Sequence, residues 1–193
     1  MKSLYMVSLG CPKNLVDSEV MLAELESAGY AIVETPIDAT LLLVNTCGFI
    51  QPAVEEAIDE ILAMASYKEQ DPSKILVVTG CLVQRYGHDL AQEFPEVDLF
   101  IGLDDFPHIA QLVHTQVRQS GRVILAKKQP SYLMNSTVAR RLATPFFRAF
   151  LKITDGCDNH CAYCMIPSIR GRLRSRTIAD IVQEAKNLDR AGV

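Results

Sequence analysis

The feature that most constrains the fold is the alternation of short apolar runs with amphipathic helical segments. Residues 40–45 and 75–79 are almost continuously apolar, which is typical of strands that are buried on both faces. Between them, residues 54–65 place apolar side chains at i, i+3, i+4, i+7, i+8 and i+11, the pattern of a helix with one buried face. This alternation predicts an α/β fold in which a parallel sheet carries helices on both faces.

The same alternation continues on either side of these segments. Further strands are expected at residues 4–9, 30–33, 99–101 and 123–126, and further helices follow Pro12, cover residues 82–93 and follow Pro107, the last with Ile109, Leu112, Val113 and Val117 on its apolar face. In the helix after Pro12 we expect Asp17 and Glu19 in the first turn, where the helix dipole favours acids, and Gly29 at the end.

The chain divides into three parts by composition. Residues 1–127 form the predicted α/β domain, and residues 128–145 are polar and basic without a clear period, as expected for a linker. Residues 146–193 begin a second domain, with an apolar strand at 146–153 and a helix at 178–191. Thr177 is the expected N-cap of that helix, with Asp180 three residues on, and its apolar face comprises Ile178, Ile181, Val182, Ala185 and Leu188.

Charge and hydropathy restrict the compartment and the partners. The formal net charge is -4, so the chain is not a general nucleic-acid binder. The arginines of the last third are as consistent with a solvated face as with a phosphate or carboxylate site: Arg140, Arg141, Arg148, Arg170, Arg172, Arg174 and Arg176. Residues 1–9 are too short for a signal sequence, and no segment approaches the ~20 apolar residues of a membrane span, so a cytoplasmic protein is expected.

Three cysteines lie close together behind the apolar run at 146–153. Cys157, Cys161 and Cys164 are spaced by three and then two residues, and soft thiolates of this kind bind iron–sulfur clusters, zinc or cuprous copper. A closed zinc site would need a fourth ligand, and His160 is adjacent to Cys161, which makes it a poor candidate from so short a loop. An iron–sulfur cluster with three protein ligands would leave one iron open to a substrate.

The other three cysteines each follow a predicted strand. Cys11, Cys47 and Cys81 come just after the strands at 4–9, 40–45 and 75–79, each beside a glycine. Parallel strands end at one edge of the sheet, where ligands of open α/β folds bind, so we expect these cysteines to converge. A single cysteine of this kind is more often a small buried hydrophobe, but three in the same relation to three strands favour a second metal site.

Together these motifs resemble the radical S-adenosylmethionine (SAM) methylthiotransferases. The spacing C-x3-C-x2-C with an aromatic residue, Tyr163, before the last cysteine resembles the radical SAM signature. The segments SLGCPKNLVDSE at residues 8–19, VNTCGFI at 44–50 and CMIPSIRG at 164–171 look like the RimO branch of that family, which modifies a ribosomal protein. The resemblance covers nearly the whole chain.

The resemblance implies a fold, cofactors and a reaction. The fold would be a Rossmann- or flavodoxin-like methylthiotransferase domain followed by the first strand, loop and helix of a partial (βα)6 barrel. Two [4Fe-4S] clusters are implied, one held by Cys11, Cys47 and Cys81 and one, which binds SAM, held by Cys157, Cys161 and Cys164. Tyr163 would lie near the SAM adenine. The implied substrate is an aspartate of small-subunit ribosomal protein twelve, whose β-carbon receives a methylthio group.

Three alternatives remain at this stage. The tRNA-modifying branch of the family shares both clusters and would methylthiolate an adenosine. An electron-transfer iron–sulfur module would hold clusters without SAM chemistry, and a zinc-bound interaction domain would be no enzyme. Because residues 146–193 match only the start of a barrel, we also expect this chain alone to be inactive.

Overall fold

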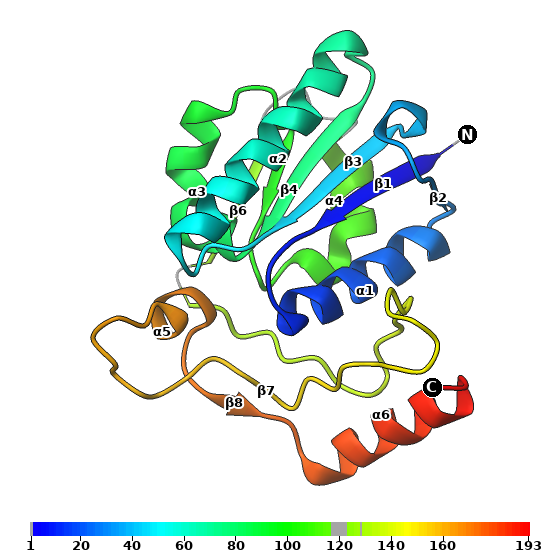
Figure 1. Cartoon of the computed structure of the whole chain (residues 1–193), viewed down its shortest axis with the longest axis vertical. Coiled ribbons are helices and arrows are strands. Elements are labelled where there is room, and N and C mark those ends of the chain that lie inside the picture. Colours follow the sequence, from blue (N-terminus) through cyan, green and yellow to red (C-terminus); the bar gives the residue numbers. More distant parts are fainter. Residues whose placement is uncertain (1, 117–122, 128) are drawn as a thin grey trace.

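A six-stranded parallel sheet forms the centre of the molecule (Figure 1). The computed structural model describes residues 2–116, 123–127 and 129–193. The strands lie in the order β2-β1-β3-β4-β5-β6, with bounds β1 (Ser3–Ser8), β2 (Ala31–Ile32), β3 (Leu41–Thr46), β4 (Ile75–Gly80), β5 (Leu99–Ile101) and β6 (Val123–Leu125). All neighbouring strands of this sheet pair in parallel. The predicted α/β class is confirmed.

Helices cover both faces of the sheet. They are α1 (Pro12–Ser27), α2 (Gln51–Gln70), α3 (Cys81–Glu93) and α4 (Ile109–Gln116), with short 3-10 turns η1 (Pro36–Asp38) and η2 (Phe106–His108). Apolar residues of α2 and α3 pack on one face and those of α1 and α4 on the other. Val117, expected on the apolar face of α4, lies outside the described residues.

The central strand β3 shows why the apolar runs of the sequence are continuous. Leu42 and Val44 point into the core beside α2 and α3, whereas Leu41 and Leu43 point into the core beside α1 and α4. All four side chains are fully buried. A strand covered on both faces must be apolar at successive positions rather than at alternate ones.

The C-terminal part of the chain lies along α1 and the carboxyl edge of the sheet (Figure 1). It contains β7 (Thr154–Asp155), α5 (Ile166–Arg170), β8 (Arg174–Ser175) and α6 (Ile178–Arg190). The expected strand at 146–153 is wrong: only β7 is extended and paired, antiparallel to β8. Residues 146–153 pair with no strand of the described chain, although the Arg176 N–H, just after β8, donates to the Ile153 carbonyl at 3.0 Å. Phe146 and Phe147 are accordingly 82% and 69% exposed.

Helix α6 begins as predicted but packs by a different face. The Thr177 side chain accepts a hydrogen bond from the Asp180 backbone N–H at 3.3 Å, which confirms the N-cap. The predicted apolar face is not buried, since Ile178 is 81% and Val182 44% exposed. The buried residue of α6 is Glu184. Glu184 pairs with Arg140 and Arg176, so ion pairs rather than apolar packing hold the helix. No helix in the described part of the chain is long and apolar enough to cross a membrane.

Candidate metal centres

The first cysteine set lies at the point where the strand order reverses. From β1 the chain adds β2 on one side of the sheet and then adds β3 to β6 on the other side. The strand order therefore reverses between β1 and β3. Cys11 is the N-cap residue of α1, Cys47 follows β3, and Cys81 is the first residue of α3 after β4. Open α/β sheets bind ligands at this position, outside the carboxyl ends of the strands.

Glycines allow the three cysteine loops to approach one another. Gly10 has φ +90°, and a Cβ atom there would lie 2.7 Å from the Cys47 Cβ and 3.1 Å from its Sγ. A Cβ atom on Gly48 would lie 2.8 Å from the Leu82 Cα. Any larger residue at these positions would force the loops apart, because real Cβ contacts are not this short.

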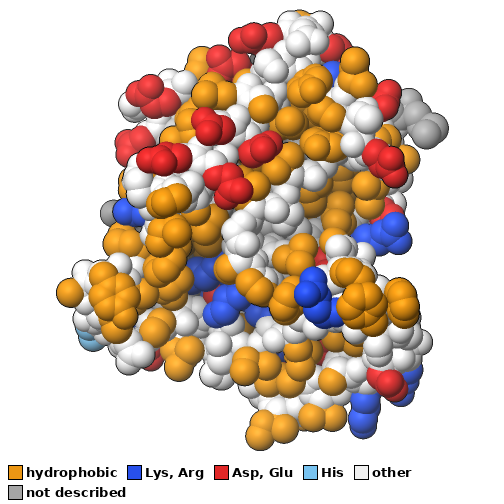
Figure 2. Space-filling model, in the orientation of Figure 1, with side chains coloured by type: hydrophobic (Ala, Val, Ile, Leu, Met, Phe, Trp, Pro, Cys, Tyr) orange, Lys and Arg blue, Asp and Glu red, His pale blue; other side chains and the backbone are white. Residues whose placement is uncertain are grey.

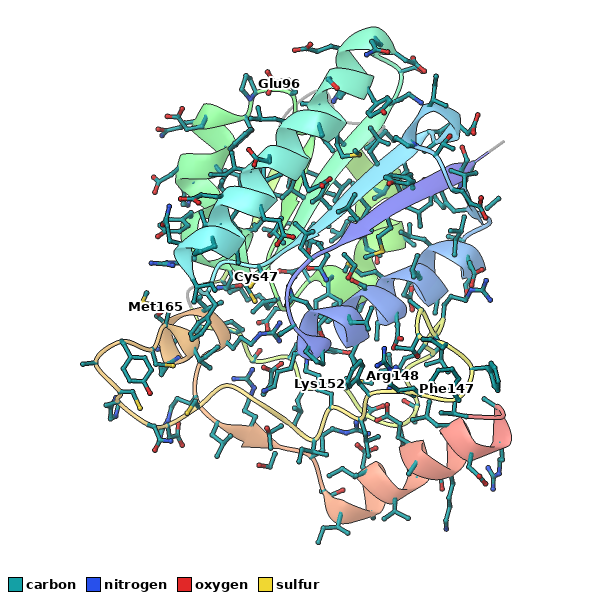
Figure 3. All side chains as sticks on the ribbon, viewed as in Figure 1. Cys47, Glu96, Phe147, Arg148, Lys152 and Met165 are labelled. Carbon is teal, nitrogen blue, oxygen red and sulfur yellow. The ribbon has the colours of Figure 1, made fainter. Side chains whose placement is uncertain are left out.

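The structure brings the three strand ends to one edge but does not by itself define a ligand set. Cys11 is exposed, Cys47 is half-buried and Cys81 is buried, and Cys47 lies at the edge that faces the C-terminal segment (Figure 3). A cavity of about 250 Å³ opens beside Cys11, lined also by Leu15 and Phe150. Within the described residues, no three His, Cys, Asp or Glu side chains are grouped so that they could hold a metal ion. The metal role of these cysteines therefore stays a prediction.

The second cysteine set occupies a loop fixed at both ends. Gly156 has φ +73°, and a Cβ atom there would lie 2.0 Å from the Arg172 carbonyl oxygen, so only glycine fits. The Cys157 backbone N–H donates to the Gly171 carbonyl at 3.1 Å. Between these ends the loop projects into solvent, with Cys161 exposed and Tyr163 85% exposed. The roles expected for Cys157, Cys161 and Cys164 as ligands and for Tyr163 beside SAM stay predictions.

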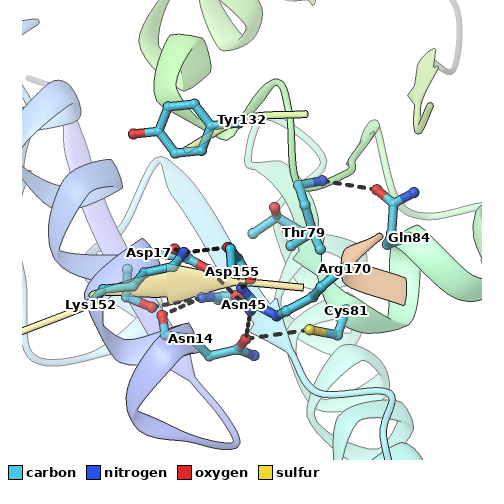
Figure 4. Close-up of polar contacts among 12 residues, drawn as sticks. Asn14, Asp17, Asn45, Thr79, Cys81, Gln84, Tyr132, Lys152, Asp155 and Arg170 are labelled. Carbon is cyan, nitrogen blue, oxygen red and sulfur yellow. Dashed lines mark hydrogen bonds and ion pairs between the residues drawn. The ribbon is translucent and has the colours of Figure 1, made fainter. Parts of the chain in front are cut away.

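A buried polar network, drawn in Figure 4, connects the two cysteine sets. The Lys152 Nζ donates to Asp17 at 2.7 Å and to Asp155 at 2.8 Å. The Arg170 Nη1 donates to Asp155 at 3.2 Å, and its Nη2 donates to Asp17 at 3.1 Å and to the Asn14 Oδ1 at 2.6 Å. All five side chains are buried. Asn14 lies three residues after Cys11 and Asp155 two residues before Cys157, so the network fixes one cysteine loop relative to the other.

The charges of this network shift the ionisation of its members. Burial raises the pKa of Asp155, but Lys152 and Arg170 more than offset this, and the pKa falls to about 2. Burial also raises the pKa of the Cys81 thiol, to about 11, although the charge and hydrogen bond of Arg170 oppose the shift. Burial lowers the pKa of Arg170, but Asp17, Cys81 and Asp155 raise it well above its ordinary range. Asp155 and Arg170 are therefore both charged at neutral pH.

A second buried ion cluster attaches α6 and the segment before it to α1. Arg140 pairs with Glu19 of α1 and with Glu184 of α6. Arg176 pairs with Glu184 and, at 2.6 Å, with Asp180. Because an unpaired buried charge is costly, these contacts hold the C-terminal segment in one position against α1.

The ion pairs show where the arginines lie. Arg140, Arg170 and Arg176 are buried against carboxylates of the chain itself. Arg141 and Arg172, with 58% and 88% exposed side chains, pair with Glu26 and Asp158 at the surface. A phosphate or carboxylate site formed by these arginines stays a prediction.

Sequence reasoning missed Asp17, Glu19 and Lys152 as network members. Helix α1 begins at Pro12, so the placement of Asp17 and Glu19 in its first turn is wrong. Both are buried against cations. A usable signal was present, because these acids interrupt an otherwise apolar stretch of a helix, where a solvated acid is not expected.

In residue type, though not in their grouping, both cysteine sets suit iron–sulfur clusters. Thiolates are the usual ligands of such clusters, and each site offers three of them. At the first site, glycine at position 10 leaves space beside Cys47, and the cationic Arg170 shares the Asn14 oxygen with Cys81, so its charge can offset that of a bound thiolate. The exposed Cys11 and Cys161 leave both sites open to an incoming cluster.

Comparisons with known proteins define the class. Residues 3–102 match the model described as Uncharacterized protein family UPF0004, and residues 151–193 match that of the Radical SAM superfamily. The chain therefore belongs to the UPF0004 family and continues into a radical SAM segment.

Within this class the most informative relatives are curated bacterial proteins. The protein named "Ribosomal protein uS12 methylthiotransferase RimO" from Desulfotalea psychrophila is 52% identical over 191 residues. Its counterpart of the same name from Syntrophus aciditrophicus is 51% identical over 195 residues. These alignments cover 98% and 99% of this chain but only 42% and 43% of the relatives. The chain thus spans less than half the length of these relatives, and the resemblance to the amino-terminal portion of the RimO branch is confirmed.

A solved structure supports the fold. The radical S-adenosylmethionine methyltransferase TsrM from Kitasatospora setae, with tryptophan substrate and a SAM analogue bound, superposes with a TM-score of 0.62. The match covers 100% of this chain and 46% of TsrM at 14% sequence identity. At this identity the likeness shows the fold alone.

Proposed function

We propose that the protein containing this chain is a radical SAM methylthiotransferase that adds a methylthio group to the β-carbon of an aspartate in ribosomal protein uS12. The observation that carries this proposal is the identity of about half of all residues, across both cysteine sets, with relatives of that name. The radical SAM match over residues 151–193 supports the same chemistry.

The proposed cofactors are SAM and two [4Fe-4S] clusters. Cys11, Cys47 and Cys81 would hold one cluster, and Cys157, Cys161 and Cys164 the other, with Tyr163 beside SAM. When bound, these cofactors supply hydrogen abstraction from an unactivated carbon and transfer of the methylthio group. The support for the first ligand set is its place at the switch point of the sheet, and for the second the radical SAM match.

The chain's own residues would position these groups. Gly10 and Gly156 let the cysteine loops close around a ligand. The Lys152, Asp155, Asp17 and Arg170 network holds the second loop against the first domain.

We also propose the division into domains at 1–127 and 146–193 with a connecting segment at 128–145, and a cytoplasmic location. The two family matches, at 3–102 and 151–193, support the division. A ribosomal protein as substrate supports the location.

The tRNA adenosine alternative is not favoured. The relatives carry the name of the uS12 enzyme, and the face drawn in Figure 2 has acidic side chains gathered over α2. Binding to a tRNA backbone depends on neutralising phosphates, which this acidic face does not do.

The test is a mass measurement on cells that lack the parent gene. Ribosomal protein uS12 should lose the mass of one methylthio group while tRNA nucleosides stay unchanged. A gene copy with Cys47→Ala should not restore the modification, whereas a copy with Glu96→Gln, a half-buried position at the opposite end of the sheet from Cys47 (Figure 3), should restore it. Loss of a tRNA methylthio group instead would overturn the assignment.

A further inference from the structure

Arg170 reaches from the second cysteine segment to the first cysteine set. It is the last residue of α5, six residues after Cys164, and only 2% of it is exposed. Its guanidinium and the Cys81 thiol share one partner, the Asn14 Oδ1, which lies 2.6 Å from the Arg170 Nη2 and 3.5 Å from the Cys81 Sγ. Helix α5 itself packs there, because Ile169 and Met165 share an apolar cluster with Cys81.

The position of the guanidinium is fixed by contacts on three sides. Its Nη1 donates to Asp155, and its Nη2 donates to Asp17 and to the Asn14 Oδ1. The same Asn14 oxygen lies 3.5 Å from the Cys81 Sγ. A planar guanidinium with several fixed donors can satisfy all these partners at once, which a lysine ammonium cannot.

The charges around Arg170 are balanced. Two cations, Lys152 and Arg170, face two carboxylates, Asp17 and Asp155. Lys152 bonds both carboxylates without Arg170. Of the two cations, only Arg170 shares a partner, Asn14, with Cys81, so pairing with the carboxylates alone does not account for its position.

We propose that Arg170 is a positioning residue that sets the reduction potential of the iron–sulfur cluster at Cys11, Cys47 and Cys81, through its positive charge, which the shared Asn14 oxygen holds beside the Cys81 sulfur. This rests on the proposed function, which places a cluster there. A cation held beside a ligand sulfur stabilises the extra negative charge of the reduced cluster and so raises its potential. Because Arg170 belongs to the segment of Cys157, Cys161 and Cys164, the second site thereby adjusts the first.

The test compares two double variants that remove equal charge. Arg170→Gln with Asp155→Asn removes one cation and one carboxylate, and leaves Asp17 paired with Lys152. Lys152→Gln with Asp155→Asn removes the same charges but keeps Arg170 against Asn14 and Asp17. Both are made in a chain with Cys157, Cys161 and Cys164 changed to alanine, so that any iron signal arises from the first site. Iron is counted, and the midpoint potential is read by electron paramagnetic resonance.

We expect the Arg170→Gln double variant to have a more negative midpoint potential than the Lys152→Gln double variant, which stays at the parental value. Equal potentials in the two would overturn the role of Arg170 while leaving the cluster in place. An absence of iron in the parental chain would instead overturn the first metal site, and with it this inference. If the Arg170→Gln variant fails to fold, Arg170→Lys replaces it in the test. The midpoint potential of the Arg170→Lys variant should also be more negative than that of the Lys152→Gln control.

Discussion

Two glycines make the cysteine loops possible at the level of single residues. Gly10 and Gly156 both have positive φ, and at each a Cβ atom would collide with a neighbouring chain segment. Gly29 also has positive φ, +87°, but nothing lies within 4 Å of its Cβ position. Alanine substitutions at Gly29 and Gly10 therefore separate two losses of stability. One comes from the left-handed backbone conformation, and the other comes from crowding at the site.

The first prediction is that Gly10→Ala destabilises the protein more than Gly29→Ala and also reduces iron binding. Gly29→Ala should cost about 1 kcal/mol, the penalty of a left-handed conformation. Gly10→Ala should cost more because it also displaces Cys47. Urea unfolding and iron content measure the two effects. Equal losses of stability with unchanged iron would show that Gly10 does not shape the site.

Asp17 is the residue on which the buried network most depends. It accepts from both Lys152 and Arg170, and its side chain is 4% exposed. Glu26, on the same helix, pairs with Arg141 at the surface, where the two side chains are 37% and 58% exposed. The two acids thus provide a buried and an exposed ion pair in one helix.

The second prediction is that Asp17→Asn lowers the free energy of unfolding by about 3 kcal/mol, because it leaves an unbalanced buried cation. Glu26→Gln should cost less than about 1 kcal/mol, since exposed pairs contribute little. Urea unfolding at neutral pH gives both values. Similar small losses in the two variants would mean that water reaches the network.

The partner of Asp17 could not be predicted from the sequence, because Lys152 lies 135 residues away. The positions of Cys11, Cys47 and Cys81 at strand ends could be predicted, since each follows an apolar run whose end is visible in the sequence. Apolar periodicity identifies an element and its end, but it carries no information on which distant charges meet.

At the level of elements, α6 illustrates the same limit. Its apolar period correctly predicts a helix and Thr177 its start, but the residues that attach it are Glu184 and Asp180. The expected strand at 146–153 fails for a related reason, because a strand needs a neighbouring strand and the sequence does not show whether one is present.

The third prediction concerns Asp180 and pH. Hydrogen bonds from Ser136, and then Arg176, lower the pKa of Asp180 from 3.8 to about 2. Glu184 and Arg140 complete the charged surroundings. Since the folded-state pKa lies below the unfolded one, Asp180 stabilises the fold above about pH 4, and this contribution is lost as the pH falls through about 2.

Wild type should therefore be more stable than Asp180→Asn at pH 5, with the difference shrinking towards pH 2. Urea unfolding across this range measures it. Asp189→Asn, at an exposed position of the same helix, controls for the loss of one negative charge. A difference that does not change with pH would refute the ionic attachment of α6.

At the level of the whole molecule, the two cysteine sets lie in different parts of the chain but are joined by buried charges. The first set belongs to the sheet and the second to the segment after residue 146. Arg170 and Lys152 cross between these parts. The apolar pattern of the sequence predicts the parallel sheet and the edge shared by Cys11, Cys47 and Cys81. It does not predict how the segment after residue 146 docks on the sheet domain.

The last prediction is that the two sets load iron independently. Changing Cys11, Cys47 and Cys81 to alanine should remove about half of the iron from the reconstituted chain, because each [4Fe-4S] cluster holds four irons. Changing Cys157, Cys161 and Cys164 should remove the other half. The first variant should still fold, since Cys81 is packed as a small apolar side chain and alanine fits in its place. Circular dichroism checks the fold, and iron, sulfide and zinc are counted after anaerobic purification. Unchanged iron in the first variant would contradict a metal role at the sheet edge, and zinc in place of iron would favour a non-enzymatic domain.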